Sequence, residues 1–259
     1  MKRDQKSINA RHEQILDLLD RKQELKADEI ASAFGISLMT VRRDLQALED
    51  QGLLKRFHGG ARRVKRENLK EELYVQRARD DISRYAAGLI QKMDSIFING
   101  SMTASGVLEY LQVPDVKVIT NNAFAAGYLT SKEIHIYLTG GNLRGHIMVG
   151  DFCLRNLLSS YATKAFLGCT GISDQGEILC DIPSELSINE TMISHAQEYY
   201  ILADYTKIGK TEASGSFTLP KSGTVITDSK ANPKILERLR EKGIRVIIAE
   251  EALQSGQVS

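Results

Sequence analysis

Residues 36–61 read ISLMTVRRDLQALEDQGLLKRFHGGA, and this stretch determines the fold of the first part of the chain. Three apolar residues recur at the spacing of one helical face: Val41, Leu45 and Leu48. Ser37 precedes them as a favourable N-cap, and Gly52 stands where a helix commonly ends in a left-handed residue. The stretch therefore predicts a helix that begins after Ser37 and ends before Gly52.

Two short basic arms follow this helix, over 53–57 and 61–64, on either side of the triplet HGG at 58–60. The glycines of the triplet allow a tight turn, so the arms predict a β-hairpin. A shorter helix is expected over 28–34, and the turn Gly35-Ile36 joins it to the second helix. Together these elements form a winged helix-turn-helix, a motif that places the N-terminal half of its second helix in the major groove of DNA.

The helix face opposite the apolar stripe is polar and basic, with Met39, Arg43 and Gln46 at its centre. A helical subdomain without DNA binding would also explain the apolar stripe, but the arginines on this face and on the hairpin favour DNA. Asp44 points back toward the buried side and is expected to hold the fold. Arg11 could reach a DNA phosphate or be solvated, and solvation is the expectation. The residues predicted to contact DNA are Ser37, Met39, Thr40, Arg42, Arg43, Gln46, Arg56, His58, Gly59, Arg62 and Arg63.

The segments SLMTVRRDL (37–45) and RFHGGA (56–61) resemble the signature of the DeoR family of bacterial sugar-metabolism repressors. The resemblance implies a winged-helix domain in front of a domain that senses a sugar phosphate. It extends over almost the whole chain, because ITNN, LTGGNLRG, VGDF, FLGCTGIS and ADYTKIGK are similar to motifs of the family's sensing domain. It also implies a sensing domain that resembles ribose-5-phosphate isomerase in fold, with its first loop as the phosphate cradle. Asn99 stands in that loop where many members carry an aspartate, so this position brings no charge.

The composition suits two domains in a reducing compartment. At 259 residues the chain exceeds one typical domain, and residues 1–66 hold 15 Lys+Arg against 10 Asp+Glu, whereas the remainder holds 19 against 23. The three cysteines form no CxxC pair and no cluster with histidine, which argues against disulfides and a metal site. No apolar run is long enough to span a bilayer, and the N-terminus does not read as a signal peptide. We expect a cytoplasmic protein without a membrane partner, metal or cofactor.

The rest of the chain predicts a connector and an α/β domain. Residues 67–81 are highly charged and read as a partly helical connector, so the expected division is 1–66, 67–81 and 82–259, with a helix over 82–93. Strands are expected over 95–99, 116–120, 135–139, 165–170, 199–203, 223–227 and 244–249. Helices are expected between most of them, over 104–111, 123–129, 152–159, 186–195 and 233–241. Such alternation predicts a doubly wound, mostly parallel sheet.

Polar and small residues follow five of the expected strands. Ligands of such sheets bind beyond the carboxyl ends of the strands, and glycines, hydroxyls and a helix N-terminus suit an anion there. Each polar turn alone is more often structural: Ser101 could simply cap its helix, and Lys207 could be solvated. The residues predicted to bind the effector are Asn99, Gly100, Ser101, Thr103, Asn121, Asn122, Gly140, Gly141, Thr170, Gly171, Glu185, Asp204 and Lys207.

Three functions fit these features. The leading hypothesis is a repressor that binds double-stranded operator DNA as a homodimer or homotetramer and is released by a phosphorylated sugar. The second is a sugar-phosphate isomerase that carries a DNA-binding head, in which Glu185, Asp204 and Lys207 could perform acid–base chemistry. The third is a constitutive DNA-binding protein with a purely structural body. No catalytic residue is assigned, and the absence of GxxxxGK[ST] and of GxGxxG after a strand argues against a nucleotide ligand.

Overall fold

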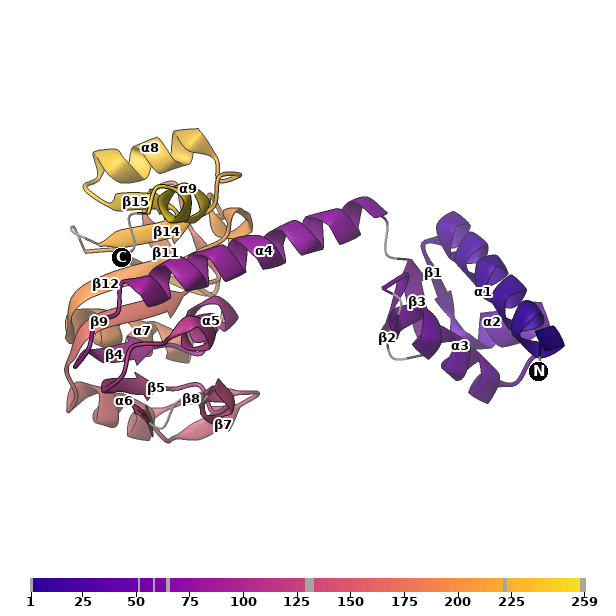
Figure 1. Ribbon diagram of the computed structural model, residues 1–259, viewed down its shortest axis with the longest axis horizontal. Coiled ribbons are helices and arrows are strands. Elements are labelled where there is room, and N and C mark those ends of the chain that lie inside the picture. The colour runs from indigo at the N-terminus through magenta and orange to yellow at the C-terminus, as the bar shows by residue number, and fades with distance from the viewer. Residues whose placement is uncertain are drawn as a thin grey trace. The chain divides into compact units, whose positions relative to one another are not determined.

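The computed structural model describes residues 2–50, 52–57, 59–63, 66–128, 133–220 and 223–256, with the backbone alone for 2–7, 9, 63 and 66–69. The chain divides into two compact units, Met1–Tyr74 and Val75–Ser259. Each unit has its own hydrophobic core. Figure 1 traces the helices and strands of both units. No helix in the described ranges is both long and apolar enough to cross a membrane.

The first unit is a three-helix bundle with a small antiparallel sheet. Its elements are α1 (Lys2–Lys22), β1 (Glu24–Lys26), α2 (Ala27–Phe34), α3 (Leu38–Asp50), β2 (Leu54–Phe57) and β3 (Gly60–Arg63). The sheet order is β1-β3-β2, so the predicted hairpin of β2 and β3 is confirmed and gains a third strand that the sequence did not predict. The predicted apolar stripe of α3 is buried among Ile15, Leu19 and Ile30.

Local chemistry fixes the ends of the helices in this unit. Ser37 caps α3 as predicted, because its Oγ accepts the backbone N–H of Thr40 at 3.2 Å. Gly35 ends α2 with φ of 61°, a left-handed conformation that glycine adopts without strain. Asp44 is buried as predicted, but the expectation that Arg11 is solvated is wrong, because Arg11 forms an ion pair with Asp44.

One helix, α4 (Arg66–Gly88), runs through the segment expected as a separate connector. No proline or glycine interrupts it before Gly88, and there it ends, five residues earlier than the predicted end at 93. The part of α4 that belongs to the second unit buries Ala78, Ile82 and Tyr85.

The second unit is built on a seven-stranded sheet, and all its recorded pairings are parallel. In sheet order the strands are β15 (Arg245–Ile248), β14 (Thr224–Thr227), β12 (Ala196–Leu202), β9 (Ala162–Gly168), β4 (Ser95–Ile98), β5 (Val116–Thr120) and β6 (Ile134–Leu138). All seven predicted strands are therefore confirmed, with ends shifted by at most three residues.

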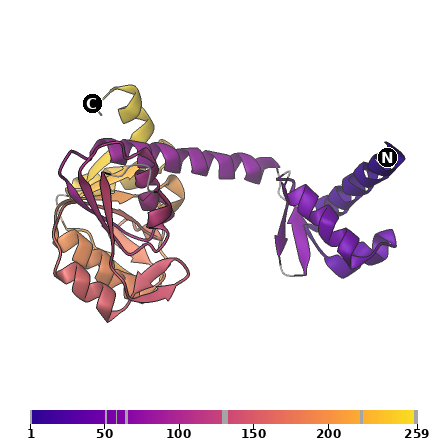
Figure 2. The same cartoon turned by 60° about the horizontal axis from the view of Figure 1, so that its bottom comes forward.

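Helices cover both faces of this sheet (Figure 2). Because side chains alternate along a strand, Ile96 and Ile98 pack with α4, α5 (Met102–Tyr110) and α9 (Ala249–Gln254), while Phe97 packs on the opposite face. That opposite face is covered by α6 (Asp151–Leu158), α7 (Pro183–Ser194) and α8 (Pro233–Glu241). The doubly wound architecture is thus confirmed.

Several shorter elements depart from the prediction. The helix expected over 123–129 is wrong: its described part holds a single 3₁₀ turn, Ala125–Tyr128, and residue 129 lies outside the described residues. A hairpin of β7 (Asn142–Arg144) and β8 (Ile147–Val149) was not predicted. A second small sheet, β10 (Gly171–Ile172), β11 (Glu177–Cys180) and β13 (Gly215–Thr218), and the 3₁₀ turn η2 (Tyr205–Lys207) were not predicted either.

Candidate effector pocket and DNA-binding face

The order of the strands places a cavity at the point where the chain direction across the sheet reverses. From β4 the chain proceeds to β5 and β6 on one side, and it later returns to β9 and β12 on the other side. Ligands of open α/β sheets bind outside the carboxyl ends of the strands at such a switch point. A cavity of about 340 Å³ lies there, between the ends of β4, β9 and β12.

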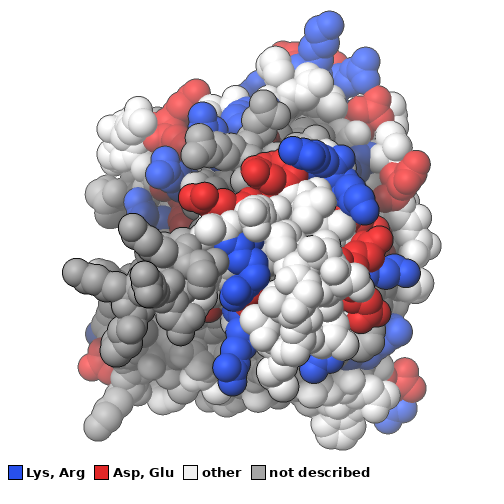
Figure 3. Space-filling model, turned by 90° about the vertical axis from the view of Figure 1, so that its right-hand side faces the viewer, with Lys and Arg blue, Asp and Glu red and all other residues white. Residues whose placement is uncertain are grey.

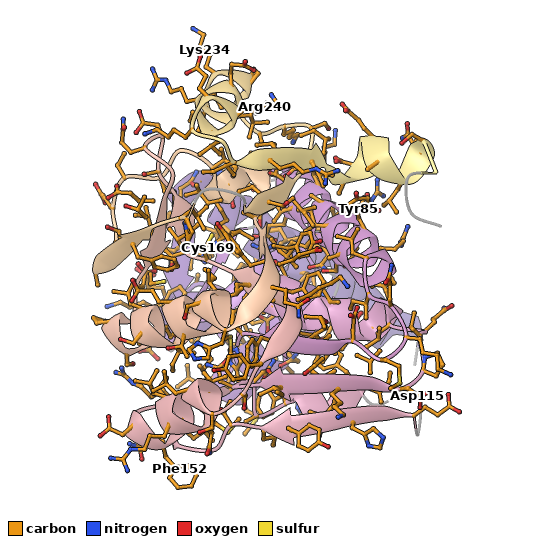
Figure 4. The ribbon with its side chains drawn as sticks, turned by 90° about the vertical axis from the view of Figure 1, so that its left-hand side faces the viewer. Tyr85, Asp115, Phe152, Cys169, Lys234 and Arg240 are labelled. Atoms are coloured by element: carbon orange, nitrogen blue, oxygen red, sulfur yellow. The ribbon has the colours of Figure 1, made fainter. Side chains whose placement is uncertain are left out.

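The walls of this cavity come from six parts of the second unit. The loop from β4 to α5 contributes Asn99, Gly100 and Ser101, and the first turn of α5 contributes Met102 and Thr103. The other walls include Arg79, His146, Gly168, Cys169, Thr170, Asp181, Glu185, Asn189, Lys207 and Lys210. Cys169 is labelled in Figure 4. Burial raises the pKa of Cys169 to about 12, so this thiol is neutral at physiological pH.

The cavity wall carries charged side chains of both signs. The cationic side chains are Arg79, Lys207 and Lys210, and the acidic ones are Asp181 and Glu185. Burial raises the pKa of Glu185 above its ordinary value, against the opposing effect of His146 and Arg144. Its buried Oε1 has no hydrogen-bond partner among the described residues, so this oxygen remains available to a donor on a ligand.

Ser101 stands at the N-terminus of α5, on the cavity wall. Its Oγ accepts the backbone N–H of Ala104 at 3.4 Å, which is a long contact for a helix cap. The free N–H groups of the first helical turn and the positive end of the helix dipole favour an anion at this point. The hydroxyl of Ser101 can therefore act as a cap and also as a ligand group.

Asn99 has a framework role in the structure. Its Nδ2 donates to Gly168 O at 2.8 Å and to Asn189 Oδ1 at 3.0 Å. Its Oδ1 accepts the N–H of Gly168 at 3.0 Å and the N–H of Ser101 at 3.2 Å. Both amide hydrogens are thus engaged in tying β4 to β9 and α7, and Asn99 shapes the cavity through its protein partners.

The exposed face of α3 carries the residues predicted to contact DNA. Met39, Arg42, Arg43 and Gln46 are exposed, with 59% of Met39 accessible, and the wing residue Arg62 is exposed as well. Figure 3 shows Lys and Arg side chains interspersed with acidic ones at the surface of the molecule. A groove of about 650 Å³ lies between α3 and the wing, and its walls include Leu38, Arg42, Arg56, Phe57 and Gly59.

Arg56 is partly engaged within the protein. Its backbone N–H donates to Glu49 Oε1 at 2.8 Å and its Nε donates to Glu49 Oε2 at 2.7 Å, and these hydrogen bonds lower the pKa of Glu49. Gln46 likewise donates to Asp50 Oδ1 at 2.7 Å. His58 and the side chain of Arg63 lie outside the described residues.

Comparison with known protein families gives a matching domain family for each unit. Residues 11–67 match the DeoR-like helix-turn-helix domain, and residues 75–229 match the DeoR C terminal sensor domain. The chain belongs to the DeoR family. It is accordingly a DNA-binding transcriptional regulator with a sensor domain, and the resemblance found in the sequence is confirmed.

Two relatives illustrate the family. The HTH-type transcriptional repressor GlcR of Bacillus subtilis is 30% identical over 92% of this chain and 95% of that protein. The lactose phosphotransferase system repressor of Staphylococcus epidermidis is 29% identical over 85% of this chain and 91% of that protein. Among solved structures, ribose 5-phosphate isomerase A of Methanocaldococcus jannaschii aligns with 50% of this chain and 53% of that chain, at 14% identity and a TM-score of 0.37.

In this DeoR-family regulator, the ends of β4, β9 and β12 contribute to the cavity wall, and the ends of β5 and β6 do not. The β7–β8 hairpin covers the end of β5, because Met148 N donates to Asn121 O at 2.8 Å and Asn122 forms a bridge with Ile147. The predicted effector residues that do not line the cavity are Asn121, Asn122, Gly140, Gly141, Gly171 and Asp204. The side chain of Asn122 is engaged instead by Ser105 and by the N–H of Phe124.

The cavity also contains residues that sequence reasoning missed. Arg79 lies in the charged segment that reads as a connector, and no local pattern separates it from its neighbours. His146 follows β7 in the hairpin that was not predicted, and its Nε2 lies 2.9 Å from Gly100 O. Lys210 stands three residues after Lys207 in the segment ADYTKIGK, so that motif was the available signal for it.

Proposed function

We propose that this DeoR-family protein is a cytoplasmic repressor that binds operator DNA as a homodimer or homotetramer and dissociates when a phosphorylated sugar occupies the cavity. The observation that carries the proposal is the convergence of Arg79, Lys207 and Lys210 with the N-terminus of α5 in one cavity at the switch point of the sheet. A cavity of this volume suits a small metabolite, and this set of donors suits a phosphate.

The two ends of the ligand have different partners in this proposal. The phosphate lies against Ser101, the first N–H groups of α5 and the three cations. The sugar hydroxyls lie against Thr170, Asp181 and Glu185, whose unpaired Oε1 accepts a hydroxyl hydrogen. The names of the relatives, a lactose phosphotransferase system repressor among them, support a ligand from sugar uptake.

The homo-oligomer follows from the DNA-binding motif. A single winged helix covers a short half-site, and dimers bind paired half-sites separated by whole turns of DNA. We place the pairing contacts after residue 65, outside the winged-helix elements.

The test begins with selection of an operator from a random duplex library by the full-length protein. Release of that duplex is then measured against glucose 6-phosphate, fructose 6-phosphate, fructose 1-phosphate, galactose 6-phosphate and ribose 5-phosphate, with the unphosphorylated sugars as controls. We expect release by at least one phosphate and by none of the free sugars. Release by free sugars alone would refute the phosphate site, and turnover of a phosphate by the wild type that is lost in Glu185→Gln would favour the isomerase alternative.

A further inference from the structure

Arg79 is held on the wall of the cavity by a buried carboxylate. Its Nε donates to Asp204 Oδ2 at 2.8 Å, and Asp204 is only 1% exposed. The other oxygen of Asp204 accepts the N–H of Thr206 at 3.0 Å and the Thr206 hydroxyl. Moving Arg79 away would leave the charge of Asp204 buried without a cationic partner, which is strongly destabilising. Asp204 therefore fixes the position of Arg79.

The ion pair occupies only one nitrogen of the guanidinium. Among the described residues, the two terminal nitrogens of Arg79 have no hydrogen-bond partner, and the side chain is 29% exposed on the cavity wall. The planar fork of arginine matches the oxygens of a phosphate, with two parallel N–H donors. Arg79 can therefore hold a phosphate without releasing Asp204.

Among the described residues that line the cavity, Arg79 alone lies on α4. It lies on α4, which begins at Arg66 in the first unit and enters the second unit at Val75. The remaining wall residues all follow Gly88 and belong to elements inside the second unit. A ligand that contacts Arg79 thus acts directly on the helix that continues into the DNA-binding unit.

We propose that Arg79 binds the effector phosphate through its terminal nitrogens while Asp204 holds Nε, and that this contact transmits effector binding to DNA binding. The inference rests on the proposed function and adds to it the residue that couples the two events. A ligand shifts an equilibrium only through its different affinities for the two states. The phosphate supplies that difference by tying α4, through Arg79, to the loop at Ser101 and the N-terminus of α5.

The experiment separates effector binding from its consequence. Full-length wild type, Arg79→Met and Lys207→Met are titrated with the most strongly releasing sugar phosphate of the panel by calorimetry. Operator affinity is then measured without effector and at saturating effector. Lys207→Met is the matched control, because it removes a cation of the same cavity that does not lie on α4.

We expect saturating effector to lower the operator affinity of the wild type by about 5- to 150-fold, the usual range of allosteric coupling. Both variants should need more effector than the wild type to reach saturation. Saturated Lys207→Met should still release DNA fully. In Arg79→Met, saturating effector should change the operator affinity by less than about twofold, which means almost no coupling between the two sites. Full release of saturated Arg79→Met would overturn the coupling role and leave the proposed function intact. No response of the wild type to any phosphate in the panel would overturn both.

Arg79→Lys provides a second test in case Arg79→Met does not fold. A lysine keeps a positive charge beside Asp204 but lacks the planar fork, so the fold should be preserved and coupling should fall. Thermal unfolding without effector reports the fold. If Arg79→Met is unfolded, wild-type coupling in a folded Arg79→Lys protein overturns the proposal.

Discussion

Arg11 of α1 and Asp44 of α3 are joined by two hydrogen bonds, Nε to Oδ2 at 2.7 Å and Nη2 to Oδ1 at 3.0 Å. His12 Nε2 lies 3.1 Å from the same Oδ1, and only 6% of the Asp44 side chain is exposed. Burial acts to raise the pKa of Asp44, but the hydrogen bonds from Arg11 and His12 outweigh it and hold this pKa below 3.8. The ion pair fixes α3 against α1 on the buried side of α3. Met39 and Arg43 lie on the exposed face of the same helix.

Asp44→Asn should destabilise the first unit at pH 7 by about 1–3 kcal/mol, because it removes the charge that Arg11 neutralises in a partly buried pair. The folded-state pKa of Asp44 is lowered, so its contribution is present above pH 4 and is lost as the pH falls below 3.8. Urea unfolding followed by circular dichroism should therefore show wild type and variant converging in acid. Asp17→Asn, an exposed change on α1, is the control. A difference that persists unchanged at pH 3 would exclude this account.

Arg43→Ala should cost about 1–3 kcal/mol of operator binding, since a good bidentate contact to a base contributes that much discrimination. Arg62→Ala, on the wing, should instead weaken binding to all duplexes alike and reduce the salt slope by about one. Fluorescence anisotropy with selected and scrambled duplexes at several salt concentrations distinguishes the two effects. Arg155→Ala, an exposed change on α6, serves as the control. Unchanged operator affinity in Arg43→Ala would contradict this placement of α3.

The sequence predicted the parallel sheet well because its central strands are buried on both faces. Such strands appear as short apolar runs, and runs such as Ser95–Ile98 mark the strand itself. β1, β7 and β8 have three residues each, too few to show a period, so they were missed.

The cavity was only partly predictable, because a polar strand end does not reveal what covers it. Ser101 and Lys207 line the cavity, but the hairpin of β7 and β8 closes the end of β5 over Asn121. Arg79 reaches the cavity from a helix more than a hundred residues before its partner Asp204, and only the tertiary fold brings them together.

The oligomeric state can be tested by truncation. Residues 1–66 alone should sediment as a monomer, and the full chain should sediment as a dimer or tetramer, because we place the pairing contacts after residue 65. Paired half-sites also predict that the selected operator is an inverted or direct repeat with a spacing of whole DNA turns. A monomeric full-length protein with tight binding to a single half-site would be incompatible with the proposal.

Ser101 and Asn232 are both N-caps, and comparing them separates a structural role from a sensing role. Ser101 caps α5 on the cavity wall, whereas Asn232 caps α8 away from it, with Oδ1 accepting the N–H of Lys234 at 3.0 Å. Loss of either cap should cost about 1 kcal/mol of stability. If Ser101 also binds the phosphate, Ser101→Ala loses a hydrogen bond to a charged group, which contributes about 1.5–3 kcal/mol.

Ser101→Ala should therefore bind the operator as the wild type does but need about 10- to 150-fold more sugar phosphate for half-release, the concentration ratio that corresponds to this loss. Asn232→Ala should lose similar stability and keep the wild-type release curve. Operator release is measured against effector concentration by anisotropy, and thermal unfolding of both variants is recorded without effector. Identical release curves for Ser101→Ala and Asn232→Ala would assign Ser101 to capping alone, and the phosphate would then have to be held by Arg79, Lys207 and Lys210 without it.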